Sequence, residues 1–305
     1  MGRIAVLGEV VIDRIITNTS KKNIAGGSAA NCALALARKG DDVKFRARFS
    51  SDKNGTFLFH EALKNELDLT YSVRAQEPAT LVEVILDENG SPSYHFYLNQ
   101  TADWHWTESE LAQLDLATQD AFVYGSLAAI FEPNYSNLQN WLNAYNDSEV
   151  LIAYDPNARP SAVAPEQHQI MKDRIKNLVS KADVVKVSDE DISWIEPSAD
   201  PHLVASSWSE SGPDLVVLTR GAKGASAYKN GVCIADVPGV QTQVADTVGA
   251  GDTLMAWLIS DLVNTPKGHR FEKSTIEKIL NRAVSAAAIT CSRVGCNPPT
   301  AGEVN

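Results

Sequence analysis

Short apolar runs alternate along this chain with longer stretches in which apolar residues recur at helical spacing. Strands are predicted at residues 3–8, 43–49, 121–125, 149–155, 184–188 and 214–219. Helices are predicted between them, at 28–39, 54–65, 166–181 and 201–211. Several strands, such as 215–218, are apolar at every position, as is typical of strands covered on both faces. The alternation predicts an α/β fold with a doubly wound, mostly parallel sheet flanked by helices.

Two early segments do not fit this alternation. Residues 10–25 are rich in valine and isoleucine but show no helical spacing, and residues 79–98 read as a hairpin turned around Asn89 and Gly90. Strands inserted at these places cannot easily join the parallel sheet. We therefore expect one domain over residues 1–305 with a small β-sheet lid formed by 10–25 and 79–98. The alternative is a hairpin that only decorates the surface.

A second hairpin is predicted near the far end of the alternating region. Its strands are 225–229 and 232–237, and Asn230 and Gly231 form the turn. We expect this hairpin to end the main sheet.

Composition narrows the possible partners. The chain has 305 residues and a net charge of −11, which argues against a general affinity for nucleic acid or an anionic membrane. A ligand that carries phosphate must then be held by a local arrangement. No apolar run reaches transmembrane length and no signal-peptide pattern is present, so a cytoplasmic protein is expected. The four cysteines lack zinc-type spacing and are predicted to be free thiols.

Residues 246–252 (DTVGAGD) carry the strongest chemical signal, because an apolar helical stretch follows them directly. Small residues let successive backbone N–H groups converge, and a helix that begins there adds the positive end of its dipole. Such a site stabilises developing negative charge. Asp252 is expected on its rim, placed to accept a proton. A donor nest beside a base is what phosphoryl transfer to a hydroxyl requires, whereas the alternative is a plain turn before a helix.

Polar residues near the N-terminus suit a polyol. Gly27 allows close backbone approach at the start of the first long helix, and Asn31 offers both a donor and an acceptor. Tight helix packing explains this pattern equally well. Asp13 lies in the first lid segment, where the residues alone favour a surface ion pair with Arg14 over contact with a sugar.

Polar residues also end three predicted strands, at the edge where open α/β sheets bind ligands. Arg159 follows one strand and is positioned to reach a phosphoryl group. Ser188 and Asp191 follow the next; their ordinary interpretation is a helix N-cap, which is compatible with Asp191 ordering water bound to magnesium. The turn after the third strand, 219–224, has two glycines and suits a nucleotide.

Together these motifs make the chain resemble the ribokinase (PfkB) family of carbohydrate kinases, and within it the bacterial fructokinases. The resemblance spans nearly the whole chain and is carried by residues 26–31, 155–159, 185–190 and 246–252. It implies a ribokinase-like domain with a small β lid. It also implies ATP-dependent phosphorylation of a sugar hydroxymethyl group, with D-fructose as the expected substrate and fructose 6-phosphate as the product.

The resemblance also implies roles for individual residues. Asp252 would be the general base, with Gly249, Ala250 and Gly251 as the anion hole and Arg159 beside it. The sugar would be held by Asp13, Gly27, Asn31 and Asp252, which moves the interpretation of Asp13 from surface to site. ATP would be held by Ser188, Thr219, Gly221, Gly224 and Gly251. Asp191 would act on Mg²⁺ through water, and a K⁺ ion would be held by Asp246, Val248, Thr290 and Gly295.

This sequence departs from the family pattern at several of these places. Asp191 stands where the family has glutamate, Ser28 replaces the lysine of ribokinases, and residues 126–129 offer no sugar-binding acid, so ribose is disfavoured. Cys296 stands where alanine is usual. Other open substrates are 2-keto-3-deoxygluconate and a nucleoside, the latter because Trp104 and Trp106 lie near the lid.

Two further expectations concern the oligomeric state and whether the protein is an enzyme. Exposed edges of the lid strands predict a homodimer that pairs through the lid. A sugar-binding sensor on the same fold is the non-enzymatic alternative. A dinucleotide-dependent dehydrogenase is disfavoured because no Gly-x-Gly-x-x-Gly follows the first strand.

Overall fold

A computed structural model describes residues 1–17, 19–86, 92–145 and 148–304. Its main sheet has eight strands in the order β14-β13-β12-β11-β10-β9-β1-β4. From β12 to β4 neighbouring strands pair in parallel, and β13 and β14 are antiparallel. The strands are β1 (Arg3–Leu7), β4 (Asp42–Arg46), β9 (Ala121–Gly125), β10 (Leu151–Asp155), β11 (Val184–Ser188), β12 (Leu215–Thr219), β13 (Ala225–Lys229) and β14 (Val232–Val237).

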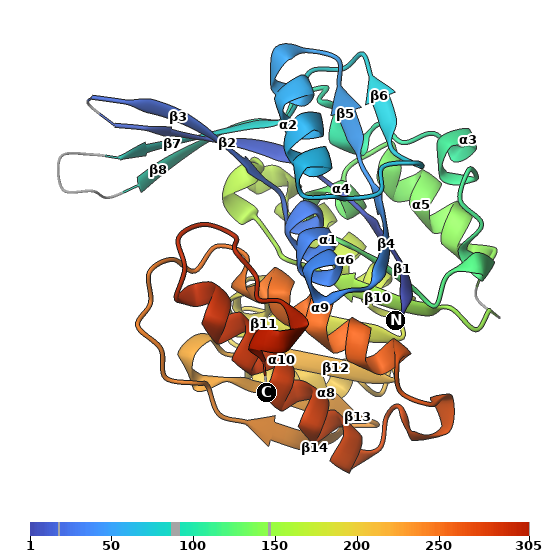
Figure 1. The fold of residues 1–305 in the computed structure, drawn as a ribbon. Coiled ribbons are helices and arrows are strands. Elements are labelled where there is room, and N and C mark those ends of the chain that lie inside the picture. The colour runs from blue at the N-terminus through green and yellow to red at the C-terminus, as the bar shows by residue number, and fades with distance from the viewer. Residues whose placement is uncertain (18, 87–91, 146–147, 305) are drawn as a thin grey trace.

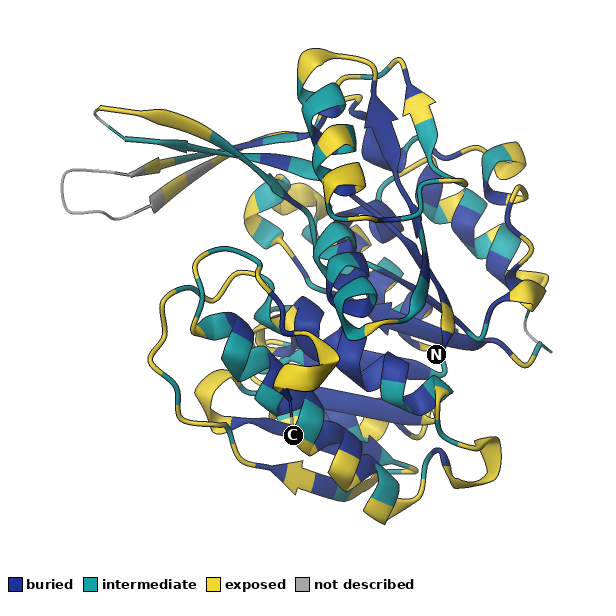
Figure 2. Cartoon of the chain, in the orientation of Figure 1, coloured by how far each residue is buried: buried dark blue, intermediate teal, exposed yellow. Residues whose placement is uncertain are grey.

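Helices cover both faces of this sheet (Figure 1). One core cluster packs α1, α2, α9 and α10 against the sheet, and a second packs α4–α8 against the other face. Figure 2 shows the central strands buried between these layers. The helices are α1 (Ser28–Lys39), α2 (Lys53–Lys64), α3 (Glu108–Leu111), α4 (Ser126–Ile130), α5 (Asn134–Asn143), α6 (His168–Val179), α7 (Asp189–Ile195), α8 (Pro201–Trp208), α9 (Ala250–Val263) and α10 (Lys273–Cys291). The doubly wound architecture predicted from the sequence is confirmed.

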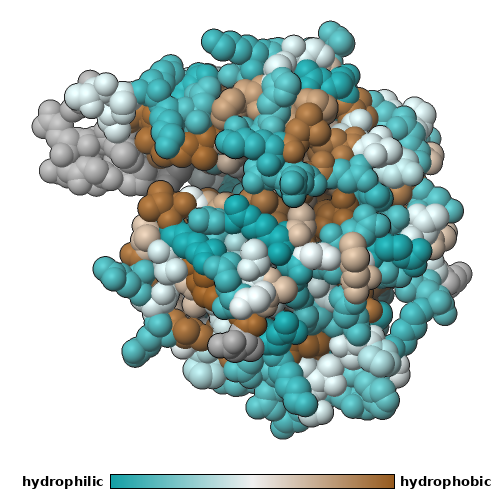
Figure 3. All heavy atoms as spheres, viewed as in Figure 1, coloured by the Kyte–Doolittle hydropathy of each residue, from teal (hydrophilic) through white to brown (hydrophobic). Residues whose placement is uncertain are grey.

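A separate four-stranded sheet projects from this body, as Figure 1 shows. Its order is β3-β2-β7-β8, formed by β2 (Val11–Ile16), β3 (Lys21–Gly26), β7 (Leu81–Leu86) and β8 (Pro92–Tyr97). The space-filling view shows a hollow beneath the overhanging sheet (Figure 3). Both predicted segments therefore form the expected small sheet. Asn89 and Gly90, the predicted turn of its second hairpin, lie outside the described residues.

The predicted strand at 43–49 is wrong in one respect, because the chain leaves the main sheet at Ala47. Residues Arg48–Ser50 form β5, which pairs with β6 (Val73–Ala75) in a sheet of its own. The Ala47 amide donates to the Ser72 hydroxyl instead of to the main sheet. None of the helices in the described ranges combines the length and the apolar character that a membrane span requires.

Candidate active site

The 246–252 segment forms a tight turn into helix α9. Gly249 caps the helix with φ 78°, a left-handed conformation that L side chains rarely adopt. A Cβ at this position would also overlap the sulfur of Cys296. Glycine is therefore required at position 249 for two reasons. One is the left-handed backbone angle, and the other is the close approach of the segment that contains Cys296.

The turn leaves backbone donors without partners. Within the described ranges, the amides of Gly249 and Gly251 have no hydrogen-bond acceptor, as expected for the start of a helix. The Ala250 amide differs, because it donates to the Thr247 carbonyl at 3.3 Å. The three amides predicted to act alike are thus unequal, and those of Gly249 and Gly251 are the ones available to an anion.

Asp252 lies in the first turn of α9 and is buried, with 8% of its surface exposed. Its Oδ1 accepts a hydrogen bond from the Ser28 hydroxyl at 2.7 Å, and its Oδ2 accepts one from the Asn31 amide at 2.8 Å. The start of α1 therefore orients this carboxylate. The side chain faces inward, onto α1, in the same turn that carries the free amides.

Sequence reasoning missed Lys186, a charged residue between the valines of β11. Its ammonium forms an ion pair with Asp155 at 2.8 Å, and both residues are only 5% exposed. The same ammonium lies 3.2 Å from where a Cβ at Gly251 would stand. Because Gly251 carries no side chain, a buried cation directly adjoins the turn that holds the free amides.

Three carboxylates surround this one lysine. Burial lowers the pKa of Lys186, but Asp155, Asp191 and Asp252 raise it more, so the pKa lies above its usual value. Burial raises the pKa of the Asp155 carboxyl to about 7, although Lys186 opposes that rise. The raised pKa of Lys186 reflects the excess of acids over bases in the cluster, whereas the raised pKa of Asp155 is due mainly to burial. The lysine is positively charged at neutral pH and the cluster favours an added cation.

Asp191 joins two of the predicted motifs. Its Oδ2 accepts hydrogen bonds from the Ser188 amide and hydroxyl in a capping box at the start of α7, and its Oδ1 accepts one from the Ala158 amide at 2.9 Å. The N-cap interpretation of Ser188 is confirmed. Because Oδ1 has a single partner in the described structure, one lone pair of this oxygen stays available for a water molecule.

Asp13 and Arg159 come from segments far apart in the sequence and interact electrostatically. Asp13 lies on β2 of the small sheet, so close to Gly26 that a Cβ there would overlap its carboxylate. Burial raises the pKa of Asp13 to about 6, and Arg159 opposes this rise. The pairing of Asp13 with Arg14, favoured by the residues alone, is not seen: Arg14 bonds to Asn23 and Glu83.

Gly27, next to Gly26, is the N-cap of α1 with φ 111°. A Cβ there would overlap the Glu9 carbonyl oxygen, which explains the glycine.

The turn after β12 holds the residues predicted for a nucleotide. Thr219 ends the strand, Gly221 starts a 3₁₀ turn with φ 53°, and Gly224 has φ 95°. A Cβ at Gly224 would overlap the Val237 carbonyl, so this turn packs directly on the end of β14. The strands β10, β11 and β12 are neighbours, so their ends place Asp155, Ser188 and Thr219 along one edge.

Asp246 ties this region to the chain after α10. Its carboxylate accepts hydrogen bonds from the Val248 amide at 3.1 Å and the Gly295 amide at 2.9 Å. Thr290 is fully buried, and its hydroxyl bonds to that of Thr253 at 3.0 Å. The structure therefore brings the four residues predicted for K⁺ to one region. The Thr290 hydroxyl is engaged in helix packing, which leaves the Asp246 carboxylate and backbone carbonyls as the oxygens available to K⁺.

Sequence comparison identifies relatives along nearly the entire chain. Residues 1–301 match the pfkB family of carbohydrate kinases. A fructokinase of Rhizobium leguminosarum bv. trifolii is 33% identical over 260 residues, which cover 84% of this chain and 78% of that protein. Fructokinase-1 of Oryza sativa subsp. japonica is 29% identical over 92% of this chain and 86% of its own.

Solved structures share the fold. The fructokinase of Xylella fastidiosa with bound ATP superimposes with a TM-score of 0.88 at 22% identity, covering 99% of this chain and 97% of that one. The fructokinase of Vibrio cholerae O395 with bound fructose, ADP and calcium gives a TM-score of 0.86 at 22% identity, with coverage of 99% and 97%. The family match over residues 1–301 decides the assignment: this chain belongs to the pfkB family of carbohydrate kinases.

Proposed function

We propose that this kinase transfers the γ-phosphoryl group of ATP to the 6-hydroxyl of D-fructose. The observation that carries the proposal is the buried Asp252, held by Ser28 and Asn31 beside the unbonded amides of Gly249 and Gly251. Relatives named fructokinase support the choice of sugar.

This geometry supports the following reaction. Asp13, Gly27 and Asn31 bind the sugar and present its hydroxyl to Asp252. Asp252 takes the hydroxyl proton as the oxygen attacks the γ-phosphorus, and the bond to the bridging oxygen breaks to release ADP. The amides of Gly249 and Gly251, with Lys186 behind them and Arg159 opposite, stabilise the negative charge that develops. The small sheet acts as a lid that excludes water.

The nucleotide and cation roles complete the proposal. Thr219, Gly221 and Gly224 contact ATP, together with Ser188. Mg²⁺ bound with the nucleotide would neutralise phosphate charge, and the lone pair left on Asp191 fits a water ligand of that ion. K⁺ would be bound near Asp246 by carbonyl oxygens, including that of Val248. Two copies are expected to pair through the exposed edges of the lid.

A substrate panel tests the sugar assignment. Fructose, ribose, 2-keto-3-deoxygluconate and a nucleoside are each offered with ATP, and ADP release is measured. We expect kcat/KM to be highest for fructose. The nucleoside alternative has lost its support, because Trp104 and Trp106 are 4% and 0% exposed and cannot stack on a base. Preference for another sugar would overturn the assignment, and sugar binding without ADP release would favour the sensor.

The Asp13 carboxylate makes sugar binding sensitive to pH. Because its pKa is about 6, protonation at lower pH removes an acceptor for sugar hydroxyls. We expect the dissociation constant for fructose to rise as the pH falls below about 6. Calorimetric titration between pH 5 and 8 measures it. Arg159→Met should move the midpoint upward, because the arginine charge lowers this pKa, and Asp13→Asn should abolish the dependence. An unchanged pH profile in Asp13→Asn would remove Asp13 from the sugar site.

A monovalent cation near Asp246 should stiffen the turn that carries the free amides. We expect a higher kcat in K⁺ than in tetramethylammonium at equal ionic strength, measured with saturating fructose and ATP. Asp246→Ala should lose this difference, because the bond to the Gly295 amide that joins the two loops disappears, together with the bond to the Val248 amide within the turn. Equal rates of the wild-type protein in both salts would show that no such ion acts.

A further inference from the structure

Four connecting segments, here called crossings, join the small sheet to the body. They lie between β1 and β2, between β3 and α1, between β6 and β7, and after β8. Two buried carboxylates lie at these crossings, Glu9 with 4% of its surface exposed and Asp103 with 1%. The mechanism above uses neither of them. Buried carboxylates are costly unless they are bonded, so their partners show what they hold in place.

Asp103 connects three of the four crossings. Its Oδ1 accepts a hydrogen bond from the Val10 amide at 2.8 Å, at the start of β2. Its Oδ2 accepts one from the hydroxyl of Thr80, the residue before β7. The Thr80 carbonyl in turn accepts from the Ile12 amide at 3.0 Å. Asp103 itself belongs to the segment that returns from β8.

Glu9 holds the fourth crossing. Its Oε1 accepts a hydrogen bond from the Ser28 amide at 3.3 Å, where β3 gives way to α1. The Ser28 hydroxyl bonds to Asp252 at 2.7 Å. A short series of bonds therefore leads from the root of the small sheet to the catalytic base.

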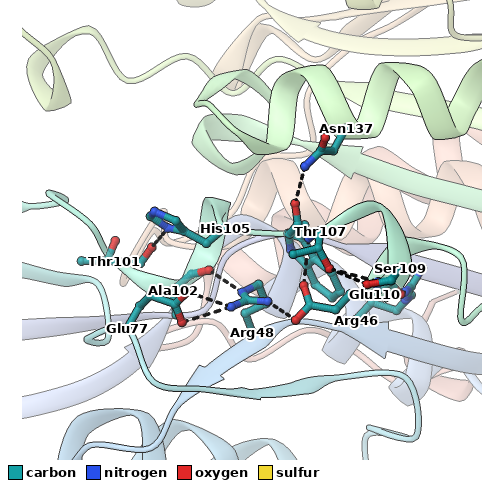
Figure 4. Close-up of polar contacts among 11 residues, drawn as sticks. Arg46, Arg48, Glu77, Thr101, Ala102, His105, Thr107, Ser109, Glu110 and Asn137 are labelled. Atoms are coloured by element: carbon teal, nitrogen blue, oxygen red, sulfur yellow. Dashed lines mark hydrogen bonds and ion pairs between the residues drawn. The ribbon is translucent and has the colours of Figure 1, made fainter.

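The segment that carries Asp103 is fixed to the body, and Figure 4 shows the contact of its neighbour Ala102 with Arg48. Arg48 donates to the Ala102 carbonyl at 3.0 Å and forms ion pairs with Glu77 and Glu110. Asn137 donates to the Trp106 carbonyl at 2.7 Å. The Asp103 carboxylate is thus held in a fixed position, from which it bonds to the segments that enter the small sheet.

We propose that Glu9 and Asp103 form a hinge that sets the orientation of the small sheet over Asp252, and that both are positioning residues for sugar binding. The proposal rests on the function proposed above, because the sugar is expected to lie between Asp13 on the sheet and Asp252 on the body. The nucleotide turn at 219–224 belongs to the body alone. A loosened hinge should therefore weaken sugar binding and leave nucleotide binding unchanged.

The test compares Asp103→Ala with Asp103→Asn. The alanine variant removes two hydrogen bonds from the hinge, so we expect KM for fructose to rise about tenfold or more while KM for ATP changes little. Asparagine keeps the acceptor for the Val10 amide and should restore most of the affinity. Thr80→Val removes the hydroxyl contacts with Asp103 and Thr101 but keeps the bond between Asp103 and the Val10 amide. It should give an intermediate rise and serves if the alanine variant does not fold.

Asp183→Ala is a matched control. Asp183 also accepts a bond from a backbone amide, that of Ile152 at 2.7 Å, but lies before β11, away from the hinge. It should lose stability in urea without a change in KM for fructose. The hinge is overturned if folded Asp103→Ala or Thr80→Val keeps the wild-type KM for fructose, or if both KM values rise together.

Backbone hydrogen exchange provides a readout that needs no substrate. The Ile12 amide should exchange faster in Asp103→Ala than in the wild-type protein, while amides of β10 and β11 keep their protection. Absence of fructokinase activity in the wild-type protein would sink the proposed function and leave this result intact. Unchanged exchange at Ile12 would sink the hinge and leave the proposed function intact.

Discussion

Replacing Asp252 by asparagine is expected to lower kcat by roughly 10²–10⁴-fold, the range associated with loss of a general base. The amide is nearly isosteric with the carboxylate and still accepts the bond from Ser28. The Asn31 amide can turn its oxygen toward the new NH2 group, so the site should keep its shape. It cannot take the hydroxyl proton. ATP contacts other residues, so its dissociation constant should stay within about twofold of the wild-type value. Coupled measurement of ADP release and calorimetric titration of ATP give the two quantities.

Asp261→Asn is the matched control for this variant. Asp261 lies on the same helix but pairs with Lys39 and Arg282, away from the predicted sugar and nucleotide contacts. It should cost stability and leave kcat nearly unchanged. Near-normal turnover in Asp252→Asn, with Asp261→Asn also active, would mean that another group accepts the proton.

The sequence predicted the architecture because the architecture depends on local patterns. Continuous apolar strands such as β12 and amphipathic helices such as α6 are visible within a few turns of chain. The end of strand β4 after Arg46 is not visible in the local sequence. Arg46 and Arg48 are 0% and 5% exposed, and their partners include Glu110, which is more than sixty positions away. The strand ends where carboxylates and carbonyls from distant segments bind the arginines. No pattern in the neighbouring residues predicts such contacts.

The candidate site likewise has features that the local sequence predicts and contacts that only the fold reveals. The 246–252 turn was recognisable because small residues and the following helix are adjacent in sequence. The contacts of Ser28 and Asn31 with Asp252 join residues more than 200 positions apart, so only the fold reveals them. Lys186 did leave a signal. A single lysine within a strand covered on both faces must find a buried acid, and Asp155 ends the neighbouring strand.

Lys186→Met should have the largest effect on stability, because it leaves the Asp155 carboxylate buried and unpaired. Loss of one partner of a buried ion pair costs about 3–5 kcal/mol in the free energy of unfolding. The cost should depend on pH. Burial already raises the pKa of Asp155 to about 7, and removal of Lys186 raises it further. An acid whose folded pKa is raised loses stability as the pH rises above its unfolded value, so the deficit should grow from pH 4 toward pH 8. Urea unfolding at several pH values measures it.

The double variant Asp155→Asn with Lys186→Met separates stability from catalysis. It removes both charges, so most of the lost stability should return and the added pH dependence should vanish. Its kcat should stay low, because no cation remains beside Gly251 to stabilise the transferring phosphoryl group; removal of one such interaction typically costs about 10²–10³-fold. If the double variant regains wild-type kcat, Lys186 only neutralises Asp155. If it stays stable but slow, the lysine acts on the phosphoryl group, and the buried pair is part of the anion hole.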